Sequence, residues 1–317
     1  MTTITVTHTA PCEWAKPTDT IDLRKACSCG AKKAGAAHAG PTPGGATPLP
    51  PPGVQYESIA AINWSSLKHL AVSPLLYRWR LSHPKAATPA MVLGTAIHCA
   101  VLEPDKLDSR FAVYDGTRRG KAWEEWQVDH PGVQSLKPDE RERVQQASAA
   151  VLAHREAAKL LRGCRHEEPQ TWTDPETGLA CKGRLDAIGP SYLLDLKTAS
   201  SIEEGMAVAP RTFTRTAAAR LYHGQLAWYH DGATLARKIQ GDVPPYVIAV
   251  ESDEPFDVGC YQLTPETLAA GRALYRSLLR RLEQCLAADY WPGVAPDLMP
   301  LELPAWTDVP TTETEGF

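Results

Sequence analysis

The sequence has no hydrophobic run long enough to cross a membrane, because no stretch of about 18 consecutive apolar residues occurs in it. Its first residues, MTTITVTHTAPCEW, also lack the basic region and apolar core of a secretory signal. We therefore expect a cytoplasmic protein with no membrane-spanning segment.

Cysteine is present but is not arranged as a disulfide framework. The eight cysteines are scattered through 317 residues, and only CSCG, at Cys27 and Cys29, brings two of them close together. With Cys12 and His38 this pair could bind zinc, but a C-x-C spacing is poor for a zinc finger. We favour reduced thiols in a flexible tail.

An excess of positive charge is missing as well. The formal net charge is −4, with 22% charged and 43% hydrophobic residues, which is ordinary for a globular protein. These values argue against a protein coated in positive charge. They leave room for a local basic groove, because nucleic acid responds to the distribution of charge.

Residues 1–55 differ from the rest of the chain. The stretch PTPGGATPLPPPG is too rich in proline and glycine for a helix or a central strand, and it is typical of an extended linker. We predict a disordered tail and linker over 1–55, a folded domain over 56–306 and a C-terminal tail over 307–317.

The folded part alternates helical and strand patterns. Apolar spacing predicts helices over 63–81, 88–104, 137–163, 217–233 and 265–287, the first of them with a break at Ser73 and Pro74. Alternation and turn residues predict a three-strand meander over 169–174, 179–188 and 191–198, and two later strands over 244–252 and 258–264. We expect an α/β fold in which helices, including several before the first strand, flank a central mixed β-sheet.

The most informative stretch is GRLDAIGPSYLLDLKT, residues 183–198, which is typical of a β-hairpin carrying two acids and a lysine. Asp195 and Lys197 point to one face of a strand, and Asp186 on the paired strand could converge on them. Two converging carboxylates repel unless a cation lies between them or one of them is protonated. Mg²⁺ or Mn²⁺ suits such oxygen ligands, and a nearby lysine can orient or deprotonate water. A structural ion pair beside a turn aspartate is the alternative interpretation.

Three further polar residues accompany this pattern. His98 lies one turn after Gly94 and borders an apolar stripe. It could be an ordinary core histidine or an additional metal ligand. Gln225 and Tyr229 lie one turn apart on the helix after the meander. They form either an ordinary helix face or a polar arm directed at a phosphate.

Four separated motifs resemble the RecE-like exonucleases (exonuclease VIII type) of the PD-(D/E)xK nuclease superfamily. They are LGTAIHCAVLEP, TWTDPETGLACKGRLDAI, YLLDLKT and YHGQLAWY, and they occur in the family's order. The similarity runs from about residue 56 to 306, including WPG at 291–293 and LPAW at 303–306, and does not cover 1–55.

The resemblance implies roles for matching residues. Lys197 would be the catalytic lysine and Gln225 the glutamine of the motif helix. Glu168 matches a position where the family tends to have an acid, although Pro169 and Gln170 depart from the usual pattern. The metal ligands would be three side chains and one backbone carbonyl, those of His98, Asp186, Asp195 and Leu196.

Several residues near the motifs could hold the DNA backbone, although any one of them could equally be a solvated side chain. Trp123 offers a nearby stacking surface, and the segment YRWR at 77–80 is a second candidate. The proposed contacts are Arg118, Arg119, Lys121, Lys182, Arg184 and Tyr229.

The leading hypothesis is a magnesium-dependent double-strand DNA exonuclease of a phage or prophage. It would act with 5′-to-3′ polarity and make single-stranded 3′ tails for recombination by annealing. The resemblance implies a partner that anneals single strands, and a homo-oligomer. A PD-(D/E)xK endonuclease and a non-catalytic DNA-binding scaffold are the alternatives. An iron–sulfur relative would need a cysteine cluster after the core, where only Cys260 and Cys285 occur.

Overall fold

The computed structural model describes residues 56–200, 206–236, 238–240, 243–304 and 307. The predicted tail over 1–55, with Cys12, Cys27, Cys29 and His38, lies outside the described residues, as does nearly all of 307–317. No helix in the described segments is both long and apolar enough to cross a lipid bilayer.

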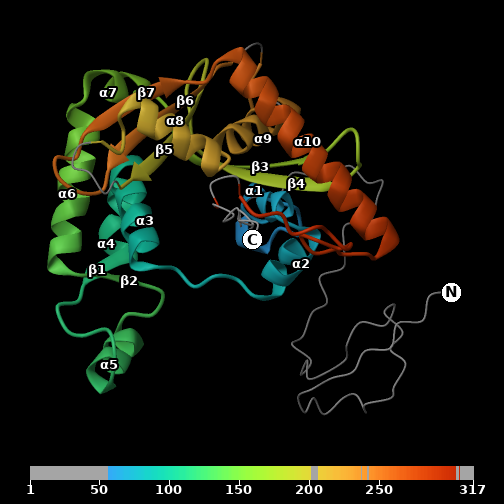
Figure 1. Ribbon diagram of the computed structural model, residues 1–317. Helices are drawn as coiled ribbons and strands as arrows, with labels where there is room; N and C mark the ends of the chain where they lie inside the picture. Colours follow the sequence, from blue (N-terminus) through green and yellow to red (C-terminus); the bar gives the residue numbers. More distant parts are fainter. Residues whose placement is uncertain (1–55, 201–205, 237, 241–242, 305–306, 308–317) are drawn as a thin grey trace, which may run out of the picture. The chain divides into compact units, whose positions relative to one another are not determined.

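A five-stranded mixed sheet forms the centre of the fold (Figure 1). The first three strands pair antiparallel as a meander, the third and fourth are parallel, and the fifth is antiparallel to the fourth. This confirms the predicted mixed sheet. In spatial order the strands are β3 (Arg165–Thr173), β4 (Ala180–Ile188), β5 (Leu193–Ala199), β6 (Pro245–Glu251) and β7 (Val258–Gln262).

Helices cover both faces of this sheet, as β6 shows. Ile248 and Val250 pack with α3 (Pro89–Leu102) and α6 (Pro138–Ala153), whereas Val247 and Ala249 pack with α8 (Pro210–Ala219) and α9 (Tyr222–Leu235). Residues two apart on a strand point to the same face of the sheet. Successive residues of β6 are therefore buried against helices on opposite faces. The longest helix, α10 (Pro265–Ala288), packs along α9.

The helical region predicted over 63–81 consists of three short elements, and the predicted break at Ser73 and Pro74 coincides with the start of the last one. Residues 63–81 form α1 (Trp64–Leu67), η2 (Lys68–Ala71) and α2 (Pro74–Ser82). Asn63 caps α1 by accepting from the Ser66 N–H at 2.8 Å, and Ser73 caps α2. A single turn, η1 (Tyr56–Ser58), precedes them.

Two predicted helices are broken by single residues. His154 adopts extended backbone angles and its ring caps the next helix, so the helix predicted over 137–163 is α6 followed by α7 (Arg155–Leu161). Leu221 adopts φ 59°, in the left-handed region, which separates α8 from α9 inside the range predicted as one helix. Periodicity alone does not reveal such backbone breaks.

The sequence pattern also missed a small unit between α3 and α6. It follows η3 (Pro104–Lys106) and contains α4 (Leu107–Arg110), β1 (Phe111–Val113), α5 (Lys121–Asp129) and β2 (Gln134–Leu136). β1 and β2 pair in parallel, and α5 buries no residue. Its half-buried Trp123 and Trp126 stack on each other at 5.1 Å, so local aromatic contacts hold this helix together.

Candidate active site at the fork between β4 and β5

The candidate site lies where β4 and β5 separate. Their pairing ends at Ala187 and Leu194, beyond which β4 stays paired with β3, and β5 with β6. Asp186 is the next residue of β4, and its Oδ2 accepts a hydrogen bond of 2.8 Å from the Leu196 N–H. The carboxylate thus accepts the Leu196 N–H in place of a backbone carbonyl, and this bond fixes the position of Asp186 at the fork.

Asp195 and Lys197 form an ion pair beside this fork, as their spacing on one strand face predicts. Asp195 is only 2% exposed, and its Oδ1 has no hydrogen-bond partner in the described part of the chain. Burial raises the pKa of Asp195 to about 6, and the Asp186 carboxylate raises it too, while Lys197 opposes both. Burial lowers the pKa of Lys197, but the two carboxylates outweigh burial and raise it overall.

His98 reaches the fork from α3. Its Nδ1 lies 3.6 Å from Asp186 Oδ2, and its ring is hydrogen-bonded to the backbone of Leu196. Burial lowers the pKa of His98 to about 4, and the charge of Lys197 lowers it as well. The imidazole is therefore neutral near pH 7, which is the form that binds a metal.

The acid that β3 contributes is Glu167 rather than Glu168. Glu167 adopts φ 51° and lies across from Asp186 in the β3–β4 register. Burial raises the pKa of Glu167 to about 7, as does the Asp186 charge, and Arg184 Nε opposes this from 2.8 Å. The sequence EEPQTW offers two adjacent acids, and only their register with β4 decides which of them joins the site.

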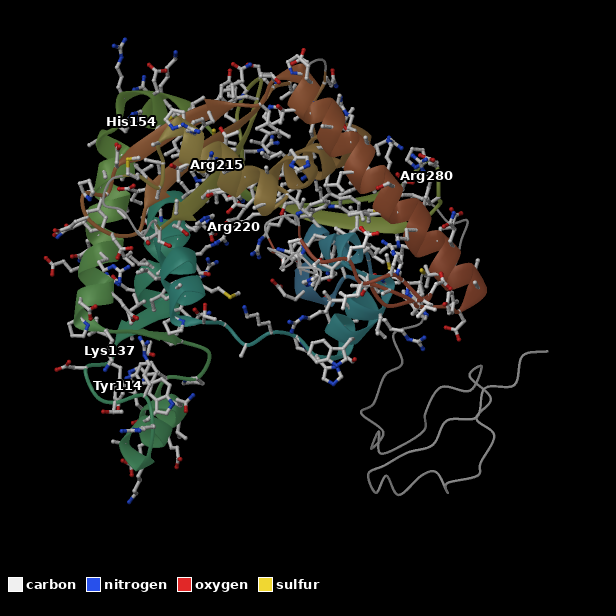
Figure 2. The ribbon with its side chains drawn as sticks, viewed as in Figure 1. Tyr114, Lys137, His154, Arg215, Arg220 and Arg280 are labelled. Atoms are coloured by element: carbon white, nitrogen blue, oxygen red, sulfur yellow. The ribbon has the colours of Figure 1, made fainter. Side chains whose placement is uncertain are left out.

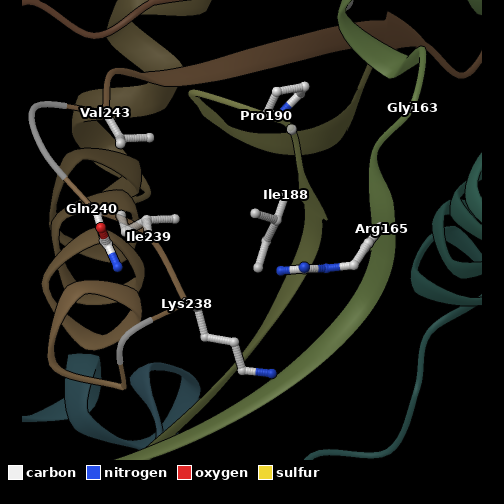
Figure 3. A pocket seen from close by; sticks show the side chains of 9 residues that line it. Gly163, Arg165, Ile188, Pro190, Lys238, Ile239, Gln240 and Val243 are labelled. Atoms are coloured by element: carbon white, nitrogen blue, oxygen red, sulfur yellow. The ribbon is translucent and has the colours of Figure 1, made fainter.

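Glu168 belongs to a different place. Its carboxylate pairs with Lys238 Nζ at 3.0 Å and with Arg165 Nε at 3.8 Å. Figure 3 shows the side chains of Arg165 and Lys238 beside a pocket of about 370 Å³. None of the predicted site residues lines this pocket, whose lining is Gly163, Arg165, Ile188, Gly189, Pro190, Lys238, Ile239, Gln240 and Val243.

A cleft of about 440 Å³ opens on Lys197. Gln225 and Tyr229 line it from α9, and Gln225 Nε2 donates to Tyr229 Oη at 3.2 Å. Lys197 Nζ also lies 4.9 Å from the centre of the Tyr222 ring. Gln225 and Tyr229 thus face the predicted catalytic lysine. The full lining is Trp64, Ser65, Lys68, His69, Val72, Lys197, Ala219, Arg220, Leu221, Tyr222, Gln225 and Tyr229.

Two cations that the sequence reasoning missed lie in this cleft. Lys68 comes from η2 and Arg220 from the end of α8, and neither is within ion-pair distance of an acid among the described residues. Burial lowers the pKa of Lys68, and so do the charges of Lys197 and Arg220. Three positive groups therefore share one cleft, which favours an anionic ligand.

The basic residues predicted near α5 are not part of this cleft. Arg118 bonds the Glu140 carboxylate at 2.5 Å and the Ser135 carbonyl at 2.9 Å, so it ties the small β1–β2 unit to α6. Arg119 is exposed, and Lys121 is 89% exposed beside Glu125. Figure 1 shows α5 beyond β1 and β2, away from the five-stranded sheet. Contact of Arg119 and Lys121 with DNA stays a prediction.

Lys182 has a structural role instead of the predicted contact with DNA. It is 5% exposed, and its Nζ donates to the carbonyls of Tyr56 at 3.0 Å and Ile59 at 2.8 Å. Arg184, two residues along β4, is half-exposed and pairs with Glu57 and Glu167. These two cations hold the start of the described chain against β4, and the buried Lys182 ammonium directs its N–H donors to backbone carbonyls instead of a phosphate.

The donor set at the fork fits a hard divalent cation. No three His, Cys, Asp or Glu side chains form a ready-made cage within the described residues. Mg²⁺ does not need one, because it is usually held by one or two carboxylates together with waters and substrate phosphates. The buried Asp195 Oδ1 without a partner is the observation that favours such an ion. Asp186, Asp195, the Leu196 carbonyl and neutral His98 would hold it.

Gly94 allows α3 to approach β5 closely at this site. A Cβ at Gly94 would lie 2.8 Å from Thr198 Oγ1. We expect Gly94→Ala to displace α3 and His98, and to slow any reaction at this site by up to about 10²-fold for a shift near 1 Å. Adding Thr198→Ala removes the clashing atom and should restore the rate. A double variant no faster than Gly94→Ala would contradict this explanation. The rates of the wild type, the two single variants and the double variant together measure the coupling between residues 94 and 198.

Comparisons with known proteins concern the fold and the family of this chain. No curated protein matches the chain. A crystal structure of a candidate exonuclease from Eubacterium rectale has the same fold, with a TM-score of 0.51 and 14% identity over 71% of this chain and 81% of that one. The model of a family described as a PDDEXK-like domain of unknown function (DUF3799) matches residues 64–297. The match spans both strands of the fork, α3 and α9, and the chain belongs to this PDDEXK-like family.

Proposed function

We propose that this protein is a metal-dependent nuclease that digests double-stranded DNA from an end. The observation that carries the proposal is the Asp195–Lys197 pair at the fork, beside a cleft that Lys68 and Arg220 also line. Among the described residues, Asp195 Oδ1 has no hydrogen-bond partner, and these two further cations have no acid within ion-pair distance. Phosphodiesters are anions, and a cleft of this charge beside hard oxygen ligands suits their hydrolysis.

Each residue has a distinct part in this proposal. A bound divalent cation would supply Lewis-acid stabilisation of the phosphate and a more acidic water. Lys197 stays protonated beside Asp195, because the carboxylates raise its pKa, so it orients water or stabilises developing negative charge rather than removing a proton. Lys68 and Arg220 hold phosphates of the strand being cut, and Gln225 positions that strand.

The finer features rest on the resemblance to RecE-like exonucleases. They are 5′-to-3′ polarity, Mg²⁺ as the metal with Mn²⁺ as substitute, and 3′ single-stranded tails for recombination. A partner that anneals those tails, and assembly of several copies of this chain, complete the proposal.

The decisive experiment compares linear duplex, labelled separately at each 5′ and 3′ end, with covalently closed circles. We expect Mg²⁺ or Mn²⁺ to support rapid loss of the linear form only, with the order of label release giving the polarity. Excess EDTA should stop the reaction because the ligands are hard oxygens. Circles cut once by a restriction enzyme should become substrates.

Other outcomes are equally specific. Cleavage of intact circles at the linear rate would favour an endonuclease. Binding of DNA without cleavage by any divalent cation would favour a non-catalytic scaffold. Undiminished cleavage in excess EDTA would contradict the metal site.

A further inference from the structure

The arginines of α8 differ from most other arginines of the described residues, because no described acid forms an ion pair with them. Most of the described arginines outside α8 pair with carboxylates, as Arg141 does with Asp108 at 2.7 Å and Arg280 with Glu176 at 2.9 Å. Across the described ranges, the α8 arginines have no acid within ion-pair distance; they are Arg211, Arg215 and, at its C-cap, Arg220.

The helix presents these arginines to solvent for a clear reason. Phe213 is its one buried residue among those described, and its ring stacks on Tyr261 at 4.7 Å, which anchors α8 to β7. Arg211 and Arg215 are four residues apart and therefore lie on the same face, one turn after the other. Both are exposed, as is Thr214. α8 thus carries a positive outer face on which no acid of the described residues lies within ion-pair distance of Arg211 or Arg215.

This face is continuous with the cleft that contains Lys197. Ala219 and Arg220, at the end of α8, line the cleft directly, and the left-handed Leu221 then turns the chain into α9. Figure 2 shows Arg215 and Arg220 near one another, and Arg280 on α10 well apart from them. A strand whose phosphate lies at Lys197 would meet Arg220 first and the outer arginines of α8 beyond it.

We propose that Arg211 and Arg215 form a phosphate track that retains the DNA strand outside the catalytic cleft. The inference rests on the proposed nuclease function and adds a binding surface to it. Arginine is suited to phosphate because its guanidinium can make two parallel hydrogen bonds. Contacts with phosphates carry no sequence information, so such a track would hold any sequence as the enzyme advances. These residues bind and retain DNA; they do not act on the reacting phosphate.

The test measures binding of a fluorescently labelled duplex by anisotropy in EDTA, over a series of KCl concentrations. For Arg211→Gln/Arg215→Gln we expect weaker binding and a slope of log K against log salt that is smaller by about two, one for each lost phosphate contact. The matched control is Arg276→Gln/Arg280→Gln, which removes two charges one turn apart on α10, both paired with Glu176. Circular dichroism and thermal melting check that both variants fold.

An unchanged slope in the α8 variant, or an equal change in both variants, would overturn the phosphate track. Cleavage in Mg²⁺ keeps this result separate from the proposed function. If the wild-type protein cleaves but the α8 variant binds normally, only the track is wrong. If the slope falls as expected but the wild-type protein never cleaves, α8 binds DNA and the nuclease proposal is wrong.

Discussion

Lys197→Met should lower the rate of DNA cleavage by about 10²- to 10⁴-fold at saturating Mg²⁺ and DNA, the range for loss of one group that acts on a proton or on developing charge. Lys197 is the cation that pairs with buried Asp195 and faces the cleft. Methionine keeps the length of the side chain, and with it the packing against Tyr222, while it removes the charge. Single-turnover cleavage of end-labelled duplex measures the effect.

The control for this prediction is Lys159→Met, which removes an exposed ammonium on α7 that pairs with Glu156. It should cleave like the wild-type protein. DNA binding by Lys197→Met in EDTA should stay within about tenfold of wild type, because a single phosphate contact contributes only part of the affinity. If Lys197→Met cleaves at the wild-type rate, the lysine is a structural ion-pair partner and has no part in the chemistry.

Asp195→Asn should remove both metal binding and cleavage. The asparagine has nearly the same shape but lacks the charge that a hard cation needs, and Asp195 Oδ1 is the buried oxygen without a partner. If the metal contributes several kcal/mol to stabilising the transition state, its loss lowers the rate by on the order of 10³-fold or more. The second readout is thermal melting with and without Mg²⁺, because a ligand that binds only the folded state raises the melting temperature.

The melting temperature of the wild-type protein should rise with Mg²⁺ concentration, and that of Asp195→Asn should change little. Asp105→Asn, at an exposed acid in η3, is the matched substitution and should keep the full Mg²⁺ response. An equal response in Asp195→Asn and the wild-type protein would show that the ion binds elsewhere.

The hairpin and its acids could be predicted because their signals are local. Gly189 and Pro190 mark the turn, and the spacing of Asp195 and Lys197 fixes their common strand face. The convergence of Asp186 follows once the hairpin is assumed. Those features depend on neighbours in sequence, where period and turn chemistry are informative.

Other features depend on partners that are distant in sequence. The choice between Glu167 and Glu168 depends on the register of β3 with β4 and on one positive φ angle. Lys182 looked like a cation available to DNA, but carbonyls more than a hundred residues away surround its ammonium. Arg220 joins the cleft only because Leu221 turns the chain. No pattern in a short window encodes these relations.

The fork has a consequence for mutational scanning of this protein. Leu196 donates its N–H to Asp186 and accepts from His98 through main-chain atoms, while its side chain packs in the core with α3. A change of side chain leaves those main-chain groups in place. Position 196 should therefore tolerate isoleucine or methionine like any core position, since apolar swaps of similar volume usually cost less than about 1.5 kcal/mol. A survey of substitutions would class Leu196 as a packing residue, although its main-chain N–H and C=O contact two of the residues on which the site depends.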